Sequence, residues 1–362
     1  MKRVTIQDIA DALGVSRNTV SKAINNASGL SDASRERILQ KAIEMGYKQF
    51  SYISAQRQKD SESQKENTKE IALFVGNMIA PAHFASLMLD KLKAELSQLG
   101  YTLSTHRVER EDILCGTLPV TFARDQVCAI ICIEMFDRAY DEMICAVGLP
   151  VLFVDGPCKR DGKDLPADQL YMDNTTAITR FVNDMLARDK RRIGFIGDYE
   201  HCQSFYERYT AFRCAIIMQN APVEEQFCIK TSDQECLSEA LTALEELPDV
   251  FICANDFVAD DAIYTLRKLG KSVPEDVMFC GFDDAPNSRI MTPSLTTVHI
   301  HTQIIAFTAV QLLLSRIEEP SLNYRIVYTE TELIYRESTH SRGKTSTNRS
   351  QMHLSAPKAP AL

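Results

Sequence analysis

Residues 4–25, VTIQDIADALGVSRNTVSKAIN, predict two short helices joined by a tight turn. Thr5 can cap the first helix, and Asp8, three residues later, comes close to a capping-box pattern. Gly14 ends that helix, where a residue that tolerates the left-handed conformation is needed. Ser16 can cap the second helix. This stretch therefore predicts a helix-turn-helix unit.

The second helix has one polar and one apolar side. At about 100° per residue, Arg17, Ser21, Asn18 and Lys22 fall on one side and Ala23, Val20 and Ile24 on the other. Such a helix can pack its apolar side on a partner helix while its polar side reaches base edges in a major groove. The simpler alternative is an amphipathic helix pair whose polar face is only solvated.

The stretch closely resembles the DNA-binding headpiece of the LacI/GalR family of bacterial regulators. The resemblance continues through Leu30-Ser31-Asp32, Arg35 and the Met45-Gly46-Tyr47 that closes a third helix. It places Arg17, Asn18 and Lys22 at base-reading positions, where arginine can bind guanine and asparagine can bind adenine.

Small polar residues of the head are better placed for the phosphates, which position a head without reading sequence. These residues are Thr5, Ser16, Thr19, Ser21, Asn25 and Ser31. Plain helix capping is the alternative role for them, and Ser16 and Ser31 are expected to do both.

Charge is divided unevenly along the chain. Residues 1–60 hold ten lysines and arginines against six aspartates and glutamates, a net charge of +4, so the remaining residues carry −13 of the total of −9. A cationic head on an acidic body confines phosphate attraction to one end.

The eleven cysteines show no pairing pattern, and no secretory signal or bilayer-length apolar run is present. A cytoplasmic protein beside the bacterial nucleoid, with core cysteines such as Cys132, Cys253 and Cys280, is expected.

The chain divides into four parts: a head and hinge (1–57), a polar linker (58–70), a two-lobed domain (71–337) and a disordered tail (338–362). Apolar runs near 71–75, 101–103, 129–133, 151–154, 193–196, 250–253 and 277–280 predict buried strands. Helical stretches alternate with them, as at 84–99 before Gly100. This alternation favours an α/β body of two doubly wound parallel-sheet lobes with a ligand cleft at the carboxyl ends of the strands.

The body also resembles the LacI/GalR family, whose effector domain is similar to periplasmic sugar-binding proteins. The matching pieces are Val154-Asp155, Asp173-Asn174, the run 192–197, Ser204 with Arg208 and Phe212, Ala254-Asn255-Asp256, the run 281–284, the run 295–298 and Arg336-Glu337-Ser338. The resemblance implies a homodimer and crossovers near residues 173, 298 and 325. Lobe one would span about 71–173 and 299–324, and lobe two about 174–298 and 325–337.

The resemblance also implies a set of effector-binding residues. They are His83, Phe84, Asp173, Ser204, Arg208, Asn255 and Asp283. A buried arginine opposite an aspartate suits a small polar ligand, because guanidinium and carboxylate groups hold hydroxyls in fixed directions. A structural ion pair between these groups is the alternative.

Three departures leave the effector unassigned. Thr231-Ser232-Asp233 stands where several relatives have a ligand-stacking aromatic residue, Ile300 replaces a polar contact, and the chain has no tryptophan. The loops 134–137 and 199–202 could line the cleft instead.

Enzyme chemistry is not expected. Asp283-Asp284 could form paired carboxylates, and His299 with His301 could hold a metal, but no nucleophile–base set accompanies either pair. No cofactor, metal or membrane partner is predicted.

The sequence thus predicts a DNA-binding transcriptional regulator, a repressor that binds a pseudo-palindromic operator as a homodimer under the control of a small effector. A regulator governed by a protein partner and a solute-binding module are the alternatives. In the hinge, Gln56 stands where relatives wedge a leucine into the minor groove, and the linker after it is longer than usual.

Overall fold

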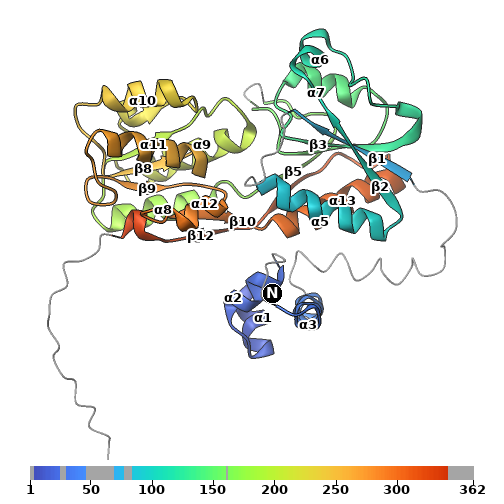
Figure 1. Cartoon of the computed structure of the whole chain (residues 1–362), viewed down its shortest axis with the longest axis horizontal. Helices are drawn as coiled ribbons and strands as arrows, with labels where there is room; N and C mark the ends of the chain where they lie inside the picture. The colour runs from blue at the N-terminus through green and yellow to red at the C-terminus, as the bar shows by residue number, and fades with distance from the viewer. Residues whose placement is uncertain (1–3, 25–29, 46–68, 77–83, 160–161, 341–362) are drawn as a thin grey trace, which may run out of the picture.

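The computed structural model describes residues 4–24, 30–45, 69–76, 84–159 and 162–340, arranged as a small helical head beside a two-lobed body (Figure 1). Asn25, His83, the hinge around Gln56 and the residues after 340 lie outside this described part.

The head consists of α1 (Ile6–Leu13), α2 (Arg17–Ile24) and α3 (Asp32–Glu44). The predicted caps are confirmed. The amide of Asp8 donates to Oγ1 of Thr5 (3.3 Å) and the amide of Thr5 donates back to Oδ2 of Asp8 (2.8 Å), which completes a capping box. Gly14 has φ 66°, and the amide of Thr19 donates to Oγ of Ser16 (3.0 Å).

Burial of apolar residues holds the three helices together and joins them to the body. Ile9, Val20 and Ile38 are buried in a cluster that also contains Ile304 and Phe307 of α13 (Thr302–Glu318). The head core therefore continues into a helix of the body.

Lobe one is built on a six-stranded parallel sheet in the order β11-β5-β4-β3-β1-β2. Its strands are β1 (Lys69–Val75), β2 (Tyr101–Arg107), β3 (Val127–Ile133), β4 (Val151–Val154), β5 (Asp168–Met172) and β11 (Ile326–Thr329). The helices α5 (Phe84–Gln98) and α13 pack on one face, and α7 (Arg138–Cys145) packs on the other, beside the short α6 (Arg110–Cys115).

Lobe two has a four-stranded parallel sheet in the order β7-β6-β8-β9. Its strands are β6 (Ile193–Ile196), β7 (Cys228–Ile229), β8 (Val250–Cys253) and β9 (Met278–Cys280). Its helices are α8 (Thr176–Ala187), α9 (Gln203–Met218), α10 (Gln234–Thr242), α11 (Asp256–Lys268) and α12 (Pro286–Ile290). The α8–α9 pair packs on one face, whereas α10 and α11 pack on the other. The predicted pair of parallel-sheet lobes is confirmed.

Two antiparallel strands, β10 (Thr297–Ile300) and β12 (Thr331–Ile334), run between the lobes. The expectation that 325–337 belong to lobe two is wrong for β11, which pairs with β5 in lobe one. Arg325 fixes this strand, because its amide and its guanidinium both donate to buried Asp168 (each 2.8 Å). The third crossover therefore falls after Thr329.

The predicted start of the tail at 338 is also wrong. Ser338 and Thr339 are buried in a short turn of 3-10 helix, Glu337–Thr339. Oγ of Ser338 donates to the carbonyl of Phe279 (2.7 Å) and accepts from the amide of Thr296 (2.8 Å). These contacts order residues whose composition alone favours disorder.

Two further features bear on the class of protein. All eleven cysteines are free, and Cys132, Cys253 and Cys280 are buried as predicted. Within the described residues, no helix combines the length and apolar character needed to cross a bilayer.

Candidate nucleic-acid interface and interlobe cleft

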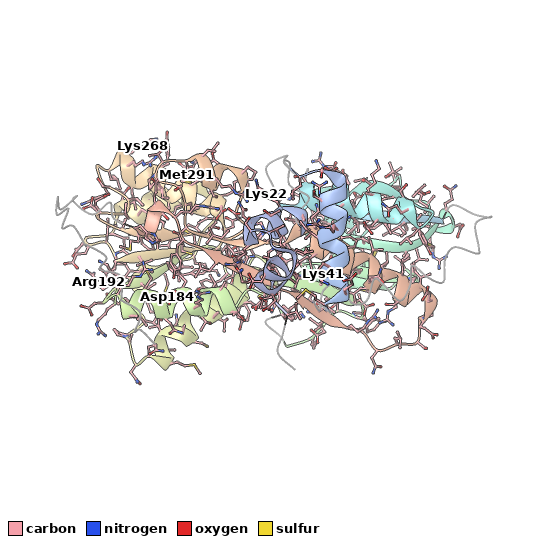
Figure 2. All side chains as sticks on the ribbon, turned by 90° about the horizontal axis from the view of Figure 1, so that it is seen from below. Lys22, Lys41, Asp184, Arg192, Lys268 and Met291 are labelled. Atoms are coloured by element: carbon pink, nitrogen blue, oxygen red, sulfur yellow. The ribbon has the colours of Figure 1, made fainter. Side chains whose placement is uncertain are left out.

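The polar side of α2 faces solvent. Arg17, Asn18 and Lys22 are exposed, whereas Val20 and Ala23 are 0% and 2% exposed in the head core. Figure 2 shows the head in front of the body, with Lys22 on α2 and Lys41 on α3. The predicted division of α2 into a buried apolar side and an exposed polar side is therefore present in the fold, and base reading by the polar side stays a prediction.

Several of the hydroxyl groups that were predicted to contact phosphate cap helices of the head. Ser16 and Thr19 share a hydroxyl–hydroxyl bond of 2.7 Å, and Ser31 accepts from the amide of Ser34 (3.3 Å) at the start of α3. Thr5 caps α1, while Ser21 is half-buried. Capping accounts for the hydroxyls of Thr5, Ser16 and Ser31 within the head, and contact of any of these residues with phosphate stays a prediction.

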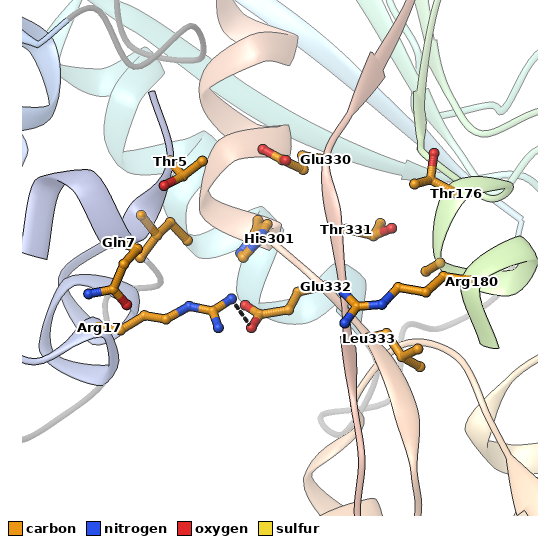
Figure 3. Close-up of a pocket in the computed structure, with 12 residues that line it drawn as sticks. Thr5, Gln7, Arg17, Thr176, Arg180, His301, Glu330, Thr331, Glu332 and Leu333 are labelled. Atoms are coloured by element: carbon orange, nitrogen blue, oxygen red, sulfur yellow. Dashed lines mark hydrogen bonds and ion pairs between the residues drawn. The ribbon is translucent and has the colours of Figure 1, made fainter. Parts of the chain in front are cut away.

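Arg17 contacts the body. Its Nη2 forms an ion pair with Oε1 of Glu332 on β12, in a pocket between head and body that is also lined by His301 and Arg180 (Figure 3). The side chains of Arg17 and Glu332 are 54% and 27% exposed. A side chain predicted to read bases is thus held by a carboxylate of the same chain.

A cavity of about 160 Å³ lies between the lobes. Its lining residues follow the carboxyl ends of parallel strands in both lobes: Glu134, Phe136, Asp155 and Met172 from lobe one, and His201, Cys202, Phe205, Arg208, Asn255 and Asp283 from lobe two. This is the place where open parallel sheets bind ligands. We call this space the interlobe cleft.

Arg208 is the central cation of the interlobe cleft and is only 2% exposed. It donates from Nε to Oδ1 of Asn174 (2.9 Å) and from Nη1 to the carbonyl of Ala254 (2.5 Å). Its Nη2 lies 3.9 Å from Oδ1 of Asp283, and the ring of Phe282 lies 3.5 Å from its guanidinium carbon. The predicted pairing of Arg208 with Asp283 therefore lies at a cavity wall and not in a dry core.

Asp283 and Asp284 point to different surroundings. Asp283, with φ 112°, lines the interlobe cleft. Asp284 is buried and binds Arg289 (Nη2–Oδ2 2.5 Å) and His299 (Nδ1–Oδ2 2.9 Å). The two carboxyl groups therefore do not form a pair, and the imidazole of His299 is hydrogen-bonded to Asp284. Among the described residues no cluster of three or more His, Cys, Asp or Glu side chains is placed to hold a metal.

Of the other residues predicted to bind the effector, one lines the interlobe cleft and others lie behind its wall or at the start of a helix. Asn255 lines the interlobe cleft while its Oδ1 caps α11 by accepting from the amide of Val258 (3.0 Å). Ser204 is 1% exposed and accepts from Nδ2 of Asn174 (3.3 Å) behind the wall. Asp173 accepts from the amides of Thr175 and Thr176 (2.9 and 3.0 Å) at the start of α8. Of Phe84 the structure describes only its place at the start of α5.

Sequence reasoning missed three wall residues as ligand contacts: Asp155, Met172 and Phe205. The sequence did contain a signal for Asp155, because this residue directly follows a predicted strand and belongs to a Val-Asp pair that resembles the family. The loops 134–137 and 199–202, which were suggested as alternative lining, do supply residues to the wall of the interlobe cleft: Glu134, Phe136, His201 and Cys202. The rings of Phe136 and His201, from opposite lobes, lie 4.7 Å apart.

A second cavity, of about 410 Å³, adjoins the first and shares His201, Phe205 and Asn255 with it. Its other lining residues are Asp198, Lys230, Thr231, Ser232, Asp233, Phe257, Val258 and Asp261. Lys230 forms an ion pair with Glu200. The stretch Thr231-Ser232-Asp233, although it lacks an aromatic ring, therefore still lines a cavity that adjoins the interlobe cleft. We call this second cavity the outer chamber.

Burial dominates the electrostatics of the interlobe cleft. Desolvation, reinforced by Asp155, raises the pKa of Glu134 to about 7. Burial also raises the pKa of Asp283 well above its ordinary value, against the opposing charge of Arg208. The pKa of Asp155 is raised by burial too. Of these three carboxyl groups, Asp155 and Asp283 interact electrostatically with the buried guanidinium of Arg208.

Comparisons with known proteins agree with both parts of this architecture. A model of bacterial regulatory proteins of the lacI family matches residues 5–49, and a model of a periplasmic binding protein-like domain matches residues 182–339. The transcriptional repressor PurR of Mannheimia succiniciproducens is 26% identical over 344 residues, covering 92% of this chain and 98% of that relative. The regulator GalR of Lacticaseibacillus casei is 29% identical over 359 residues, with 92% and 99% covered.

Solved structures share the fold. A complex of the transcriptional regulator CelR with cellobiose has a TM-score of 0.65 at 22% identity and covers 93% of this chain and 100% of its own. A lac repressor dimer bound to operator and the anti-inducer ONPF has a TM-score of 0.64 at 21% identity, with 94% and 100% covered.

Proposed function

Because this chain belongs to the LacI/GalR family of bacterial transcriptional regulators, we propose that it is a repressor that binds a pseudo-palindromic operator as a homodimer. In this proposal, a small polar effector enters the interlobe cleft and changes the relative orientation of the lobes. The likeness to a lac repressor dimer on its operator supports the dimer and the DNA partner. Such a repressor works beside the chromosome, in the bacterial cytoplasm.

One observation carries the proposal: a helix with an exposed Arg17-Asn18 pair and a cleft walled by Arg208 and Asp283 occur in one chain. The head offers groups that read base edges. The interlobe cleft draws on both lobes, so a ligand bound there changes the balance between their open and closed arrangements.

The test uses the full chain. Duplexes selected from a random library should share two half-sites about one helical turn apart. A metabolite panel is then screened for a shift in melting temperature, and the compound that stabilises the protein should change operator affinity.

Two arginines of α9 provide a matched pair of variants. Arg208→Ala should keep operator binding and lose the response to the effector. Arg213→Ala, which removes an ion pair with exposed Glu225 outside both cavities, should keep both. A complete lack of thermal shift and operator release across the panel would favour regulation by a protein partner instead.

A further inference from the structure

The first two turns of α9 carry two neighbouring rows of polar side chains. In one row, Arg208 lines the interlobe cleft and Ser204 lies behind its wall. In the other row, Gln203 and Glu207 contact lobe one instead. Because residues four apart lie on the same side of a helix, adjacent rows of one helix serve the cleft and the contact between the lobes.

Gln203 and Glu207 form hydrogen bonds from lobe two to lobe one. The hydroxyl of Tyr328, on β11 of lobe one, donates to Oε1 of Glu207 (2.8 Å), which also accepts from Nε2 of Gln203 (3.0 Å). The amide of Gln203 donates to the carbonyl of Gly156 (3.0 Å), and the amide of Lys159 donates to Oε1 of Gln203 (2.9 Å). Gly156 and Lys159 follow β4, so these bonds join the start of α9 to lobe one.

Tyr328 is placed by lobe one but lies at the boundary with solvent. Its ring stacks on that of buried Tyr171, with the ring centroids 5.5 Å apart. Its side of the contact remains 49% exposed as a residue. The hydroxyl is therefore held in position to meet Glu207, while separation of the two groups would not open an apolar core.

Asn174 connects the two rows of α9. It lies between β5 and α8, where the chain first passes from lobe one to lobe two, and it is 0% exposed. Its Oδ1 accepts from Nε of Arg208 (2.9 Å), and its Nδ2 donates to Oε2 of Glu207 (2.8 Å). A carboxamide can accept at one end and donate at the other. A continuous path of hydrogen bonds therefore runs from Arg208 through Asn174 and Glu207 to Tyr328.

We propose that Asn174 is a positioning residue that couples Arg208 to a lobe-to-lobe latch formed by Glu207 and Tyr328. The proposal rests on the function proposed above, since it concerns the regulation of the same interlobe cleft. An effector group that binds Arg208 shifts the donor that Asn174 accepts, and Asn174 passes this shift to Glu207. The latch stabilises the arrangement in which the two walls of the cleft lie together, so its strength sets the balance between open and closed lobes.

Hydrogen–deuterium exchange of the full-length protein tests the latch without any ligand. The amides of Gln203 and Lys159 donate across the lobe boundary, so their exchange, resolved by fragmentation to single amides, reports how often the lobes separate. Tyr328→Phe should speed exchange at both amides by about threefold to tenfold, because it removes one hydrogen bond to a carboxylate. Tyr324→Phe, which removes an exposed hydroxyl outside this network, is the matched control and should leave both rates unchanged.

Asn174→Asp tests the coupling to Glu207. It keeps the acceptor for Arg208 and replaces the donor toward Glu207 with a carboxylate oxygen, so exchange at the two amides should rise as in Tyr328→Phe. Glu207→Gln, added to Asn174→Asp, supplies a donor in the opposite direction and should return both rates to within about twofold of the wild type. A loss of packing alone would not be rescued in this way. Should Asn174→Asp fail to fold by itself, the double variant and Tyr328→Phe still decide the matter.

Arg208→Lys tests the other end of the path, because it removes the Nε donor that Asn174 accepts. It should speed exchange at the amides of Gln203 and Lys159 in the otherwise wild-type chain. In the Tyr328→Phe background it should add less than about twofold, since both substitutions act through the same latch. Fully independent effects of the two substitutions would contradict the coupling.

The outcomes separate this inference from the proposed function. Wild-type exchange at both amides in Tyr328→Phe would overturn the latch, and a failure of Glu207→Gln to rescue Asn174→Asp would overturn the role of Asn174. Operator binding is measured separately on the selected duplexes. If the amides respond as expected but no duplex is ever selected, the latch stands and the repressor function fails.

Discussion

Arg17 of the helix predicted to read bases and Glu332 of the crossover strand β12, 315 positions apart in the chain, form an ion pair. Ile304 and Phe307 of α13 pack into the head core beside it. Within the part of the chain that the structure describes, an ion pair and an apolar contact therefore join the head to the body. Arg17 has to leave Glu332 before its guanidinium can reach a base edge.

This relationship predicts that Glu332→Gln strengthens operator binding when no effector is present. Because both side chains are partly exposed, the ion pair is worth at most about 1 kcal/mol, so the gain should be up to about fivefold. Fluorescence anisotropy with a labelled operator measures it. Glu245→Gln, an exposed substitution in lobe two, serves as the control, and equal affinities for the two variants would contradict the idea.

Arg17→Ala should reduce binding to the specific operator by about 1–3 kcal/mol and relax the preference at one base pair. The physical reason is the loss of a bidentate contact from the exposed side of α2. Competition assays against single-base variants of the operator would show it. Affinity for an unrelated duplex should fall much less, and an unchanged base preference would show that Arg17 does not read sequence.

Asp168 should be among the most sensitive positions for stability. It is 0% exposed and accepts from Nη2 of Arg316 (2.9 Å) and Nη2 of Arg325 (2.8 Å). Burial by itself raises the pKa of Asp168, but the hydrogen bonds from both arginines outweigh it and keep the pKa below its ordinary value. Asp168→Ala leaves these guanidinium groups without their shared partner and should cost about 3–5 kcal/mol in urea denaturation.

The same pKa gives Asp168 a defined pH dependence. Its folded-state pKa lies below the unfolded value, so its contribution is present above the unfolded value of 3.8 and is lost as the pH falls through the folded value. The wild type should therefore lose more stability than Asp168→Ala on strong acidification. Parallel losses in the two proteins would show that the cluster does not remain ionised.

Asp141 should have the opposite pH dependence. It is buried, both carboxyl oxygens lack a hydrogen-bond partner among the described residues, and burial raises its pKa from 3.8 to about 8. Between these values the folded protein binds more protons than the unfolded chain, so the free energy of unfolding falls as the pH rises. Asp141→Asn should flatten this fall by roughly 1–3 kcal/mol in denaturation at a series of pH values.

A control for this prediction is Asp125→Asn, whose side chain is 97% exposed. It should reproduce the wild-type pH dependence. If Asp141→Asn did the same, Asp141 would have to ionise within the fold with the help of a partner.

The hinge gives a prediction that rests on sequence alone, because Gln56 lies outside the described residues. A glutamine cannot unstack a base step at the low desolvation cost of an apolar wedge. We expect a weak central bend and tolerance of one or two base pairs inserted at the operator centre, measured by gel mobility of circularly permuted fragments. A strong bend, with binding lost on a single insertion, would show that the hinge acts as it does in relatives.

Local signals in the sequence determined the helix-turn-helix head and most strands. The Thr5–Asp8 capping box, Gly14 and the apolar side of α2 depend on residues within one or two turns of each other, so their effect can be calculated from spacing alone. The short apolar runs at 151–154, 193–196 and 250–253 became strands with those bounds, because burial on both faces leaves little choice of structure.

Tertiary structure decided the rest, through contacts between residues far apart in the chain. Asp168 holds Arg325 and thereby places β11 in lobe one, and Thr296 and Phe279 order Ser338. Only packing set Ser204 behind the wall of the interlobe cleft and Asp155 on it. Composition records how many acidic residues the chain has, but Glu134, Asp155 and Asp283 come to line one cleft only where strand ends from two lobes meet. Spacing along one chain does not encode that meeting, because the free energy that fixes it comes from burying the surfaces of both lobes together.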